Sequence, residues 1–142
     1  MPEVRGELPV HTLCDEIETP GPGQIRSLLT VAGNPVVALP NAVRVDKALV
    51  QLEFMISVDF YINASTRHAN IILPPTGPLT TAHYDVAFYN LAVRNIAHYS
   101  PPDLPMPEDE MDKWEILYKL GAIFGGFGAA ASLEVIDDVV ID

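Results

Sequence analysis

Two short polar segments that follow apolar runs contain the residue types that could bind a ligand. The first run ends at Gly33-Asn34-Pro35, and the second ends at Asp59. A glycine turn lets the backbone approach a ligand closely, because no side chain stands in the way. A carboxylate accepts hydrogen bonds, for instance from the N1 and N2 donors of a guanine base. These four residues are therefore candidates for ligand binding.

Each of these features also has a plain structural explanation. Any strand can end in a glycine-proline turn, and Asp59 could equally cap the short turn that contains Ser65 and Thr66. The sequence has no Gly-x-Gly-x-x-Gly motif and no Walker lysine motif, so the usual dinucleotide and triphosphate fingerprints are absent. The residues alone leave ligand binding and plain turn chemistry both open.

No other side chains form a catalytic or metal-binding pattern. None of the four histidines lies in a His-x-x-x-His or Glu-x-x-His pair, and no serine lies in a Gly-x-Ser-x-Gly elbow. The histidines are His11, His68, His83 and His98. The single cysteine, Cys14, is expected to pack as a small apolar residue. We therefore predict no catalytic residue and no metal ligand.

The elements that must position the candidate residues are short strands. Apolar, β-branched runs closed by chain breakers are typical of buried strands in a parallel sheet, and we expect them at 28–32, 54–58 and 70–73. A helix is predicted over 41–52, and one or two helical turns over 63–69. The sequence thus predicts an α/β fold. In open α/β sheets ligands bind beyond the carboxyl ends of the strands, where the candidate residues lie.

The rest of the chain gives weaker patterns. An amphipathic helix is expected at 8–18, an irregular apolar connector at 36–40, and mixed strand at 80–100. The acidic residues 108–110 are expected to open the clearest helix, since the helix dipole favours them in the first turn. The predicted inward stripe of that helix consists of Trp114, Leu117, Leu120 and Phe124.

Composition and charge exclude several classes of protein. With 142 residues, 49% of them hydrophobic and 19% charged, the chain suits a single packed domain over 1–142, with a tail at 126–142 that could be flexible. The net charge of −11 repels nucleic acids and anionic membranes. No apolar run approaches the ~20 residues that span a bilayer, and the N-terminus has no signal-peptide character, so a cytoplasmic location is expected. A fragment of a longer chain would look the same.

Five motifs follow one another in a fixed order. They are Val31-Ala32-Gly33-Asn34-Pro35, Arg44-Val45-Asp46-x-Ala48-Leu49, Phe54-Met55-Ile56-Ser57-Val58-Asp59, Thr66-Arg67-His68-Ala69-Asn70-Ile71-Ile72-Leu73-Pro74 and Ala92-Val93-Arg94-Asn95. In this order and spacing, from about residue 8 to about residue 125, the chain resembles the molybdopterin oxidoreductases. This is the group of dimethyl sulfoxide reductase, formate dehydrogenase and nitrate reductase.

The resemblance implies an internal segment of the large subunit. It implies a Rossmann-like three-layer α/β domain, with a mostly parallel sheet flanked by helices, that receives the guanosine end of a molybdopterin guanine dinucleotide. The residues that match cofactor-contacting positions of the family are Gly33, Asn34, Pro35, Asp59, Pro75 and Thr76. Among them, Asp59 matches the family's guanine-recognising aspartate. The family usually has Glu-Thr where this chain has Ala64-Ser65, and Asp where it has Asn70.

The resemblance also implies what the segment lacks. Molybdenum or tungsten, and an iron–sulfur cluster, would be held by the rest of the full-length chain, whose other domains are the expected partners. The isolated segment is not expected to be catalytic. Two alternatives stay open: a stand-alone nucleotide-binding domain, or a protein-interaction α/β domain that uses the acidic helix, both without redox activity.

Overall fold

The computed structural model describes residues 7–84 and 89–128. The chain divides into two compact units, 1–74 and 75–142. The predicted strand pattern at 85–88, and residues 129–142 of the predicted tail, lie outside the described residues. The single domain over 1–142 stays a prediction.

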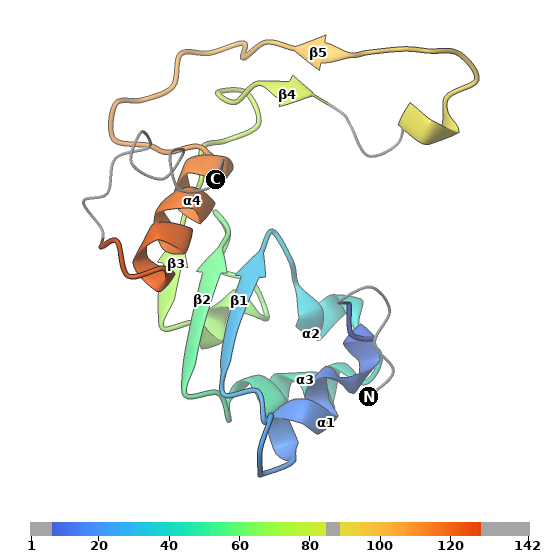
Figure 1. Cartoon of the computed structure of the whole chain (residues 1–142), viewed down its shortest axis with the longest axis vertical. Coiled ribbons are helices and arrows are strands. Elements are labelled where there is room, and N and C mark those ends of the chain that lie inside the picture. Colours follow the sequence, from blue (N-terminus) through green and yellow to red (C-terminus); the bar gives the residue numbers. More distant parts are fainter. Residues whose placement is uncertain (1–6, 85–88, 129–142) are drawn as a thin grey trace. The chain divides into compact units, whose positions relative to one another are not determined.

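The first unit contains a parallel three-stranded sheet (Figure 1). Its strands are β1 (Ser27–Val31), β2 (Phe54–Val58) and β3 (Ile71–Leu73), in the order β1-β2-β3. Both neighbouring pairs run parallel, so all three carboxyl ends lie at the same edge of the sheet. The predicted strands and the α/β fold class are confirmed.

The central strand carries the sheet's buried residues. Four consecutive residues of β2, from Met55 to Val58, are buried, and successive side chains of a strand point to opposite faces. Continuous burial of this kind is typical of a central parallel strand. In β1, at the edge of the sheet, exposed and half-buried residues alternate instead.

Three helices pack with the sheet in the first unit (Figure 1). They are α1 (Leu13–Glu18), which follows the 3₁₀ turn η1 (Val10–Thr12), then α2 (Pro35–Ala38) and α3 (Ala42–Leu49). The buried core consists of Cys14, Ile17, Val36, Val45, Ala48, Leu49 and Met55. Burial raises the pKa of the Cys14 thiol, as expected for a cysteine that packs as an apolar residue.

The helix boundaries differ in part from the prediction. The helices expected at 8–18 and 41–52 are present in shorter form, and the side chain of Asn41 caps α3 by accepting a hydrogen bond from Arg44 N at 3.3 Å. The irregular connector expected at 36–40 is wrong. Pro35 opens a short helix there, because its fixed φ suits the first helical turn.

Arg44 joins α3 to α1. Its Nη2 lies 2.6 Å from Glu18 Oε2 and 2.5 Å from Asp15 Oδ1. Hydrogen bonds to these two carboxylates raise the pKa of Arg44. The guanidinium side chain is 41% exposed, so solvent screens the contact and its contribution to stability is small.

The second unit has few regular elements among its described residues. Strands β4 (His83–Tyr84) and β5 (Tyr99–Ser100) pair antiparallel, and the 3₁₀ turn η3 covers Tyr89–Leu91. Within 80–100, the described residues thus contain strand at 83–84 and 99–100, and the described residues 92–98 form no strand. The described residues contain no helix that is long and apolar enough to cross a membrane.

The main helix of the second unit is α4 (Lys113–Phe124). It begins five residues after the predicted acidic start at 108, because Asp112 and Glu115 form a capping box in which Asp112 N donates to Glu115 Oε2 at 2.9 Å. The predicted inward stripe is wrong except for Leu120. The buried residues are Ile116, Leu120 and Ala122, whereas Trp114 and Phe124 are 56% and 69% exposed.

Candidate functional site

The loops that follow β1 and β2 start side by side. Ala32 N donates a hydrogen bond to Val58 O at 2.9 Å, and Asp59 N donates to Leu73 O at 3.2 Å. Gly33 and Asp59 therefore follow neighbouring parallel strands at the same edge of the sheet. This is the edge at which α/β proteins bind ligands.

The turn after β1 does not use the conformational freedom of its glycine. The residue with a left-handed backbone is Ala32, at φ +49°, whereas Gly33 needs no positive φ. A Cβ atom at Gly33 would meet only Val31 O, at an ordinary 3.7 Å. The N–H groups of Gly33 and Asn34 have no hydrogen-bond partner in the part of the chain that the structure describes. Within the described residues, the fold thus leaves two backbone donors unpaired here and room for a Cβ atom at Gly33.

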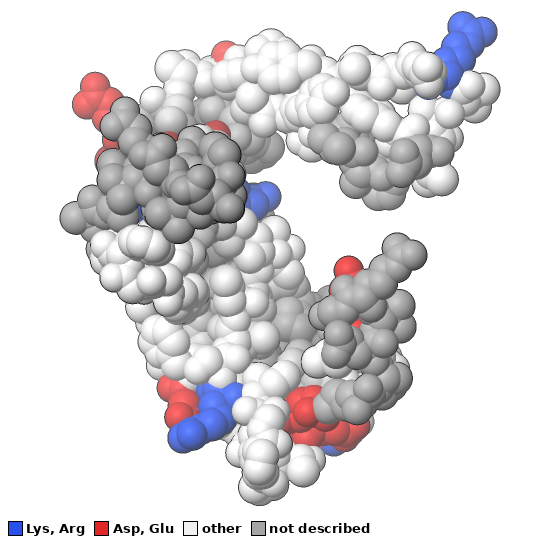
Figure 2. Space-filling view, viewed as in Figure 1, with Lys and Arg blue, Asp and Glu red and all other residues white. Residues whose placement is uncertain are grey.

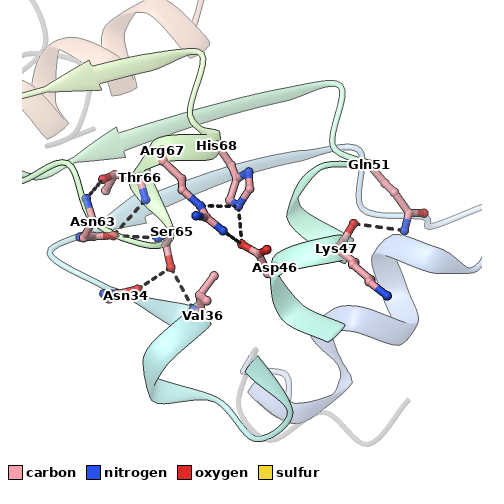
Figure 3. Close-up of polar contacts among 10 residues, drawn as sticks. All are labelled: Asn34, Val36, Asp46, Lys47, Gln51, Asn63, Ser65, Thr66, Arg67 and His68. Atoms are coloured by element: carbon pink, nitrogen blue, oxygen red, sulfur yellow. Dashed lines mark hydrogen bonds and ion pairs between the residues drawn. The ribbon is translucent and has the colours of Figure 1, made fainter. Parts of the chain in front are cut away.

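Ser65 fixes the side chain of Asn34 (Figure 3). The Ser65 hydroxyl donates to Asn34 Oδ1 at 2.7 Å and accepts from Val36 N at 2.9 Å. Because Asn34 Oδ1 faces Ser65, the Nδ2 group of the same amide points away from Ser65. This group has no partner among residues 7–84 and 89–128, so it is free to donate.

Asp59 caps the turn that begins with it. Its Oδ1 accepts from Tyr61 N at 3.0 Å, and its Oδ2 accepts from Asn63 Nδ2 at 3.1 Å. The Ser65-Thr66 turn is capped by Asn63 instead, whose Oδ1 accepts from Ser65 N at 2.9 Å. Each carboxylate oxygen has two lone pairs, so Asp59 keeps one free acceptor position on each oxygen.

These contacts join the two loops into one hydrogen-bonded path. The path runs from Asn34 through Ser65 and Asn63 to Asp59. Asn63 and Ser65 are not among the site residues predicted from the sequence. An asparagine followed two residues later by serine is typical of an Asx turn, and that pattern could have identified them.

The predicted residues Pro75 and Thr76 belong to the second unit, and both are buried. Thr76 Oγ1 donates to Asp112 Oδ1 at 2.9 Å, and Thr76 N donates to Met111 O at 3.0 Å. Asp112 also accepts a hydrogen bond from the Thr81 hydroxyl. Thr76 therefore has a structural role at the start of α4, and its contact with a ligand stays a prediction.

A second polar cluster ties the 3₁₀ turn η2 (Thr66–His68) to α3 (Figure 3). Asp46 Oδ1 lies 2.7 Å from His68 Nε2 and 2.5 Å from Arg67 Nη2. Hydrogen bonds from His68 and Arg67 lower the pKa of the Asp46 carboxyl. Among the described residues, no group of three or more histidine, cysteine or acidic side chains could hold a metal ion.

The residues that depart from the family pattern keep hydrogen bonds or apolar packing. Asn70 Oδ1 accepts from Met55 N at 2.7 Å, as an aspartate oxygen could, and Asn70 N donates to Met55 O at 2.8 Å. Ser65 supplies a hydroxyl, as a threonine would, and Ala64 packs against the core. On the face drawn in Figure 2, charged side chains form small groups with wide uncharged areas between them.

Comparisons with known proteins give similar sequences over most of the chain. The family model described as molybdopterin oxidoreductase matches residues 4–79. The assimilatory nitrate reductase catalytic subunit of Bacillus subtilis is 29% identical over 103 residues, which are 72% of this chain and 14% of that protein. A nitrate reductase of Synechocystis is 34% identical over 109 residues, with coverage of 72% and 14%.

A third relative is named for a different activity. The F420-dependent formate dehydrogenase subunit alpha of Methanocaldococcus jannaschii is 25% identical over 115 residues, which are 81% of this chain and 16% of that protein. No solved structure gives a significant match. The chain spans about one seventh of the length of these relatives. Since the family model covers more than half of it, the chain belongs to the molybdopterin oxidoreductase family.

Proposed function

We propose that this chain is the segment of a molybdopterin-dependent oxidoreductase that holds the guanosine end of a molybdopterin guanine dinucleotide. The observation that carries the proposal is the Asp59 carboxylate, which stands at the carboxyl edge of the sheet with a free acceptor position on each oxygen. The N1–H and N2–H donors of guanine match two such acceptors. The cofactor, when bound, would supply the redox chemistry through its metal.

The loop after β1 supports the same ligand. The N–H groups of Gly33 and Asn34, together with the Asn34 Nδ2 group, offer donors to a phosphate or ribose oxygen. The absence of a side chain at Gly33 is not needed by the fold, since a Cβ there would make only an ordinary contact. A ligand that comes close to the backbone at Gly33 would explain why this position has no side chain. Pro75 and Thr76 are proposed as further nucleotide contacts.

The surroundings of Asp59 support burial by further parts of the same chain. Phe60, Tyr61 and Ile62 follow it directly and are 49%, 67% and 82% exposed. A run of exposed apolar residues beside a binding edge is typical of a surface that another domain covers. The other domains of a longer oxidoreductase, with their molybdenum or tungsten and an iron–sulfur cluster, are the proposed partners. A cytoplasmic location, which a free thiol at Cys14 suits, is part of the proposal.

The test compares guanine and adenine nucleotides on the 142-residue chain. Much of the cofactor's surface would be buried by other domains, so we expect weak binding of GMP. The expected dissociation constant is of millimolar order, which corresponds to a binding free energy of about −4 kcal/mol. Asp59→Asn replaces one acceptor oxygen by a donor that faces guanine's own donors. Loss of a charge-assisted hydrogen bond costs about 1.5–3 kcal/mol, enough to abolish the preference for GMP over AMP.

Asp46→Asn is the matched control. It makes the same chemical change at another half-buried aspartate of the first unit, one whose hydrogen bonds go to His68 and Arg67. The GMP preference should survive this change. Titrations followed by NMR would measure both variants. If the unchanged chain binds GMP and AMP equally, or if Asp59→Asn keeps the preference, the proposed function is wrong.

A further inference from the structure

Asn63 has a side-chain amide whose orientation its surroundings fix. Its Oδ1 accepts hydrogen bonds from Ser65 N at 2.9 Å and from Thr66 N at 3.0 Å. Both of these residues are fully buried, at 0% exposure. Since the oxygen of the amide is held on one side, the Nδ2 group must point the other way. There it lies 3.1 Å from Asp59 Oδ2.

The turn that carries Asn63 is closed by further hydrogen bonds. Asn63 N donates to Thr66 Oγ1 at 2.7 Å, and Thr66 Oγ1 donates to Tyr61 O at 2.9 Å. Tyr61 N in turn donates to Asp59 Oδ1 at 3.0 Å. Both oxygens of Asp59 are therefore held by donors of the same closed turn, which fixes the plane of the carboxylate.

We propose that Asn63 is a positioning residue that sets the orientation of the Asp59 carboxylate and thereby its selectivity for guanine. This inference rests on the proposed function. A carboxylate accepts the parallel N1–H and N2–H donors of guanine only when both oxygens face the base edge. Hypoxanthine has the N1 donor but lacks the exocyclic amine. Discrimination between GMP and IMP thus measures whether the second oxygen is in place.

Asn63→Asp separates positioning from turn stability. The aspartate keeps the oxygen that accepts from Ser65 N and Thr66 N, so the turn keeps its cap. It replaces the Nδ2 donor by an oxygen that faces Asp59 Oδ2, and two like charges at this distance repel. We expect the unchanged chain to prefer GMP over IMP by about ten- to hundredfold, the range that one charge-assisted hydrogen bond covers. In Asn63→Asp the ratio should fall to about one.

Ile62→Asp is the matched control for the added charge. Ile62 is 82% exposed and precedes Asn63 directly, so this variant adds a carboxylate to the same turn without removing a hydrogen bond. Repulsion of the nucleotide phosphate should weaken GMP and IMP equally and leave their ratio unchanged. Dissociation constants from NMR titrations of the 142-residue chain give all three ratios.

Three results would overturn the inference. The first is an Asn63→Asp variant that folds and keeps the GMP to IMP ratio of the unchanged chain. The second result applies if that variant does not fold. GMP bound at Asp59 should shift the side-chain amide resonances of Asn63 in the unchanged chain, and resonances that stay fixed while Tyr61 N–H shifts contradict the inference.

The third result applies if the chain shows no GMP preference, which refutes the proposed function. In that case, Asn63 amide resonances that are unchanged in the Asp59→Asn variant refute the positioning contact itself.

Discussion

Ser65→Ala is the substitution for which the structure gives the clearest energetic expectation. Ser65 is completely buried, and its hydroxyl is the partner of the backbone N–H of Val36, itself 7% exposed. The alanine variant leaves that N–H buried without an acceptor. The second partner, Asn34 Oδ1, belongs to a half-buried side chain and can turn to water. The cost of the change is therefore mainly that of one orphaned backbone donor.

A buried, unsatisfied donor costs about 1–3 kcal/mol, so we expect the free energy of unfolding to fall by about 2 kcal/mol. Small proteins lose about 1–3 kcal/mol of stability per molar urea, so the urea midpoint should fall by about 1 M. Circular dichroism during urea titration measures this shift. The GMP affinity should also fall, because Asn34 loses the contact that orients its Nδ2 group.

Ser57→Ala is the matched control. Ser57 is also fully buried, but among the described residues its hydroxyl meets only the Thr30 hydroxyl, at 2.8 Å, and no backbone group. The half-buried Thr30 can rotate its hydroxyl to a new partner, so the expected loss is smaller, about 0.5–1.5 kcal/mol. If Ser65→Ala lowers the urea midpoint no more than Ser57→Ala does, the reasoning about the orphaned Val36 N–H is wrong.

Two further predictions concern the first unit. Gly33→Ala should leave the free energy of unfolding unchanged or raise it by about 0.4–1 kcal/mol, because the site has room for a Cβ atom and the unfolded chain loses conformational freedom. The same substitution should weaken GMP binding, and an unchanged GMP affinity would argue against close approach of a ligand. Asp46 should stabilise the fold above about pH 4 and lose this effect as the pH falls further, since hydrogen bonds from His68 and Arg67 lower its folded-state pKa. Urea midpoints at pH 3 and pH 6 test this, and the difference in stability between the unchanged chain and Asp46→Asn should be smaller at pH 3.

The parts of the fold that the sequence predicts well are those specified by local pattern. The three strands were predictable because β-branched runs end at chain breakers, and this placed Gly33 and Asp59 at neighbouring strand ends. Helix α2 was not predictable from its four residues alone. Its first turn is joined to Ser65 by the hydrogen bond from Val36 N, and these two residues lie 29 positions apart in the sequence. A contact of that kind leaves no periodic signal.

The candidate site divides in the same way. Asp59 and the turn at Gly33 could be found from position, whereas Asn63 and Ser65 gained their roles only when the two loops met. The start and the buried residues of α4 also escaped prediction: Asp112 rather than residues 108–110 caps the helix, and its buried residues are Ile116, Leu120 and Ala122. Thr76 was expected to contact a nucleotide, and its hydroxyl is occupied by Asp112.

The buried thiol of Cys14 allows opening of the first unit to be measured by chemical labelling. It is the sole cysteine of the chain, it is 6% exposed, and burial raises its pKa, so a thiol reagent can react only when the protein opens. Local detachment of α1 and unfolding of the whole unit would both expose it. Arg44 holds α1 through half-exposed ion pairs, which salt screens. Labelling that accelerates with ionic strength would therefore report detachment of α1, and labelling that does not would report opening of the entire unit.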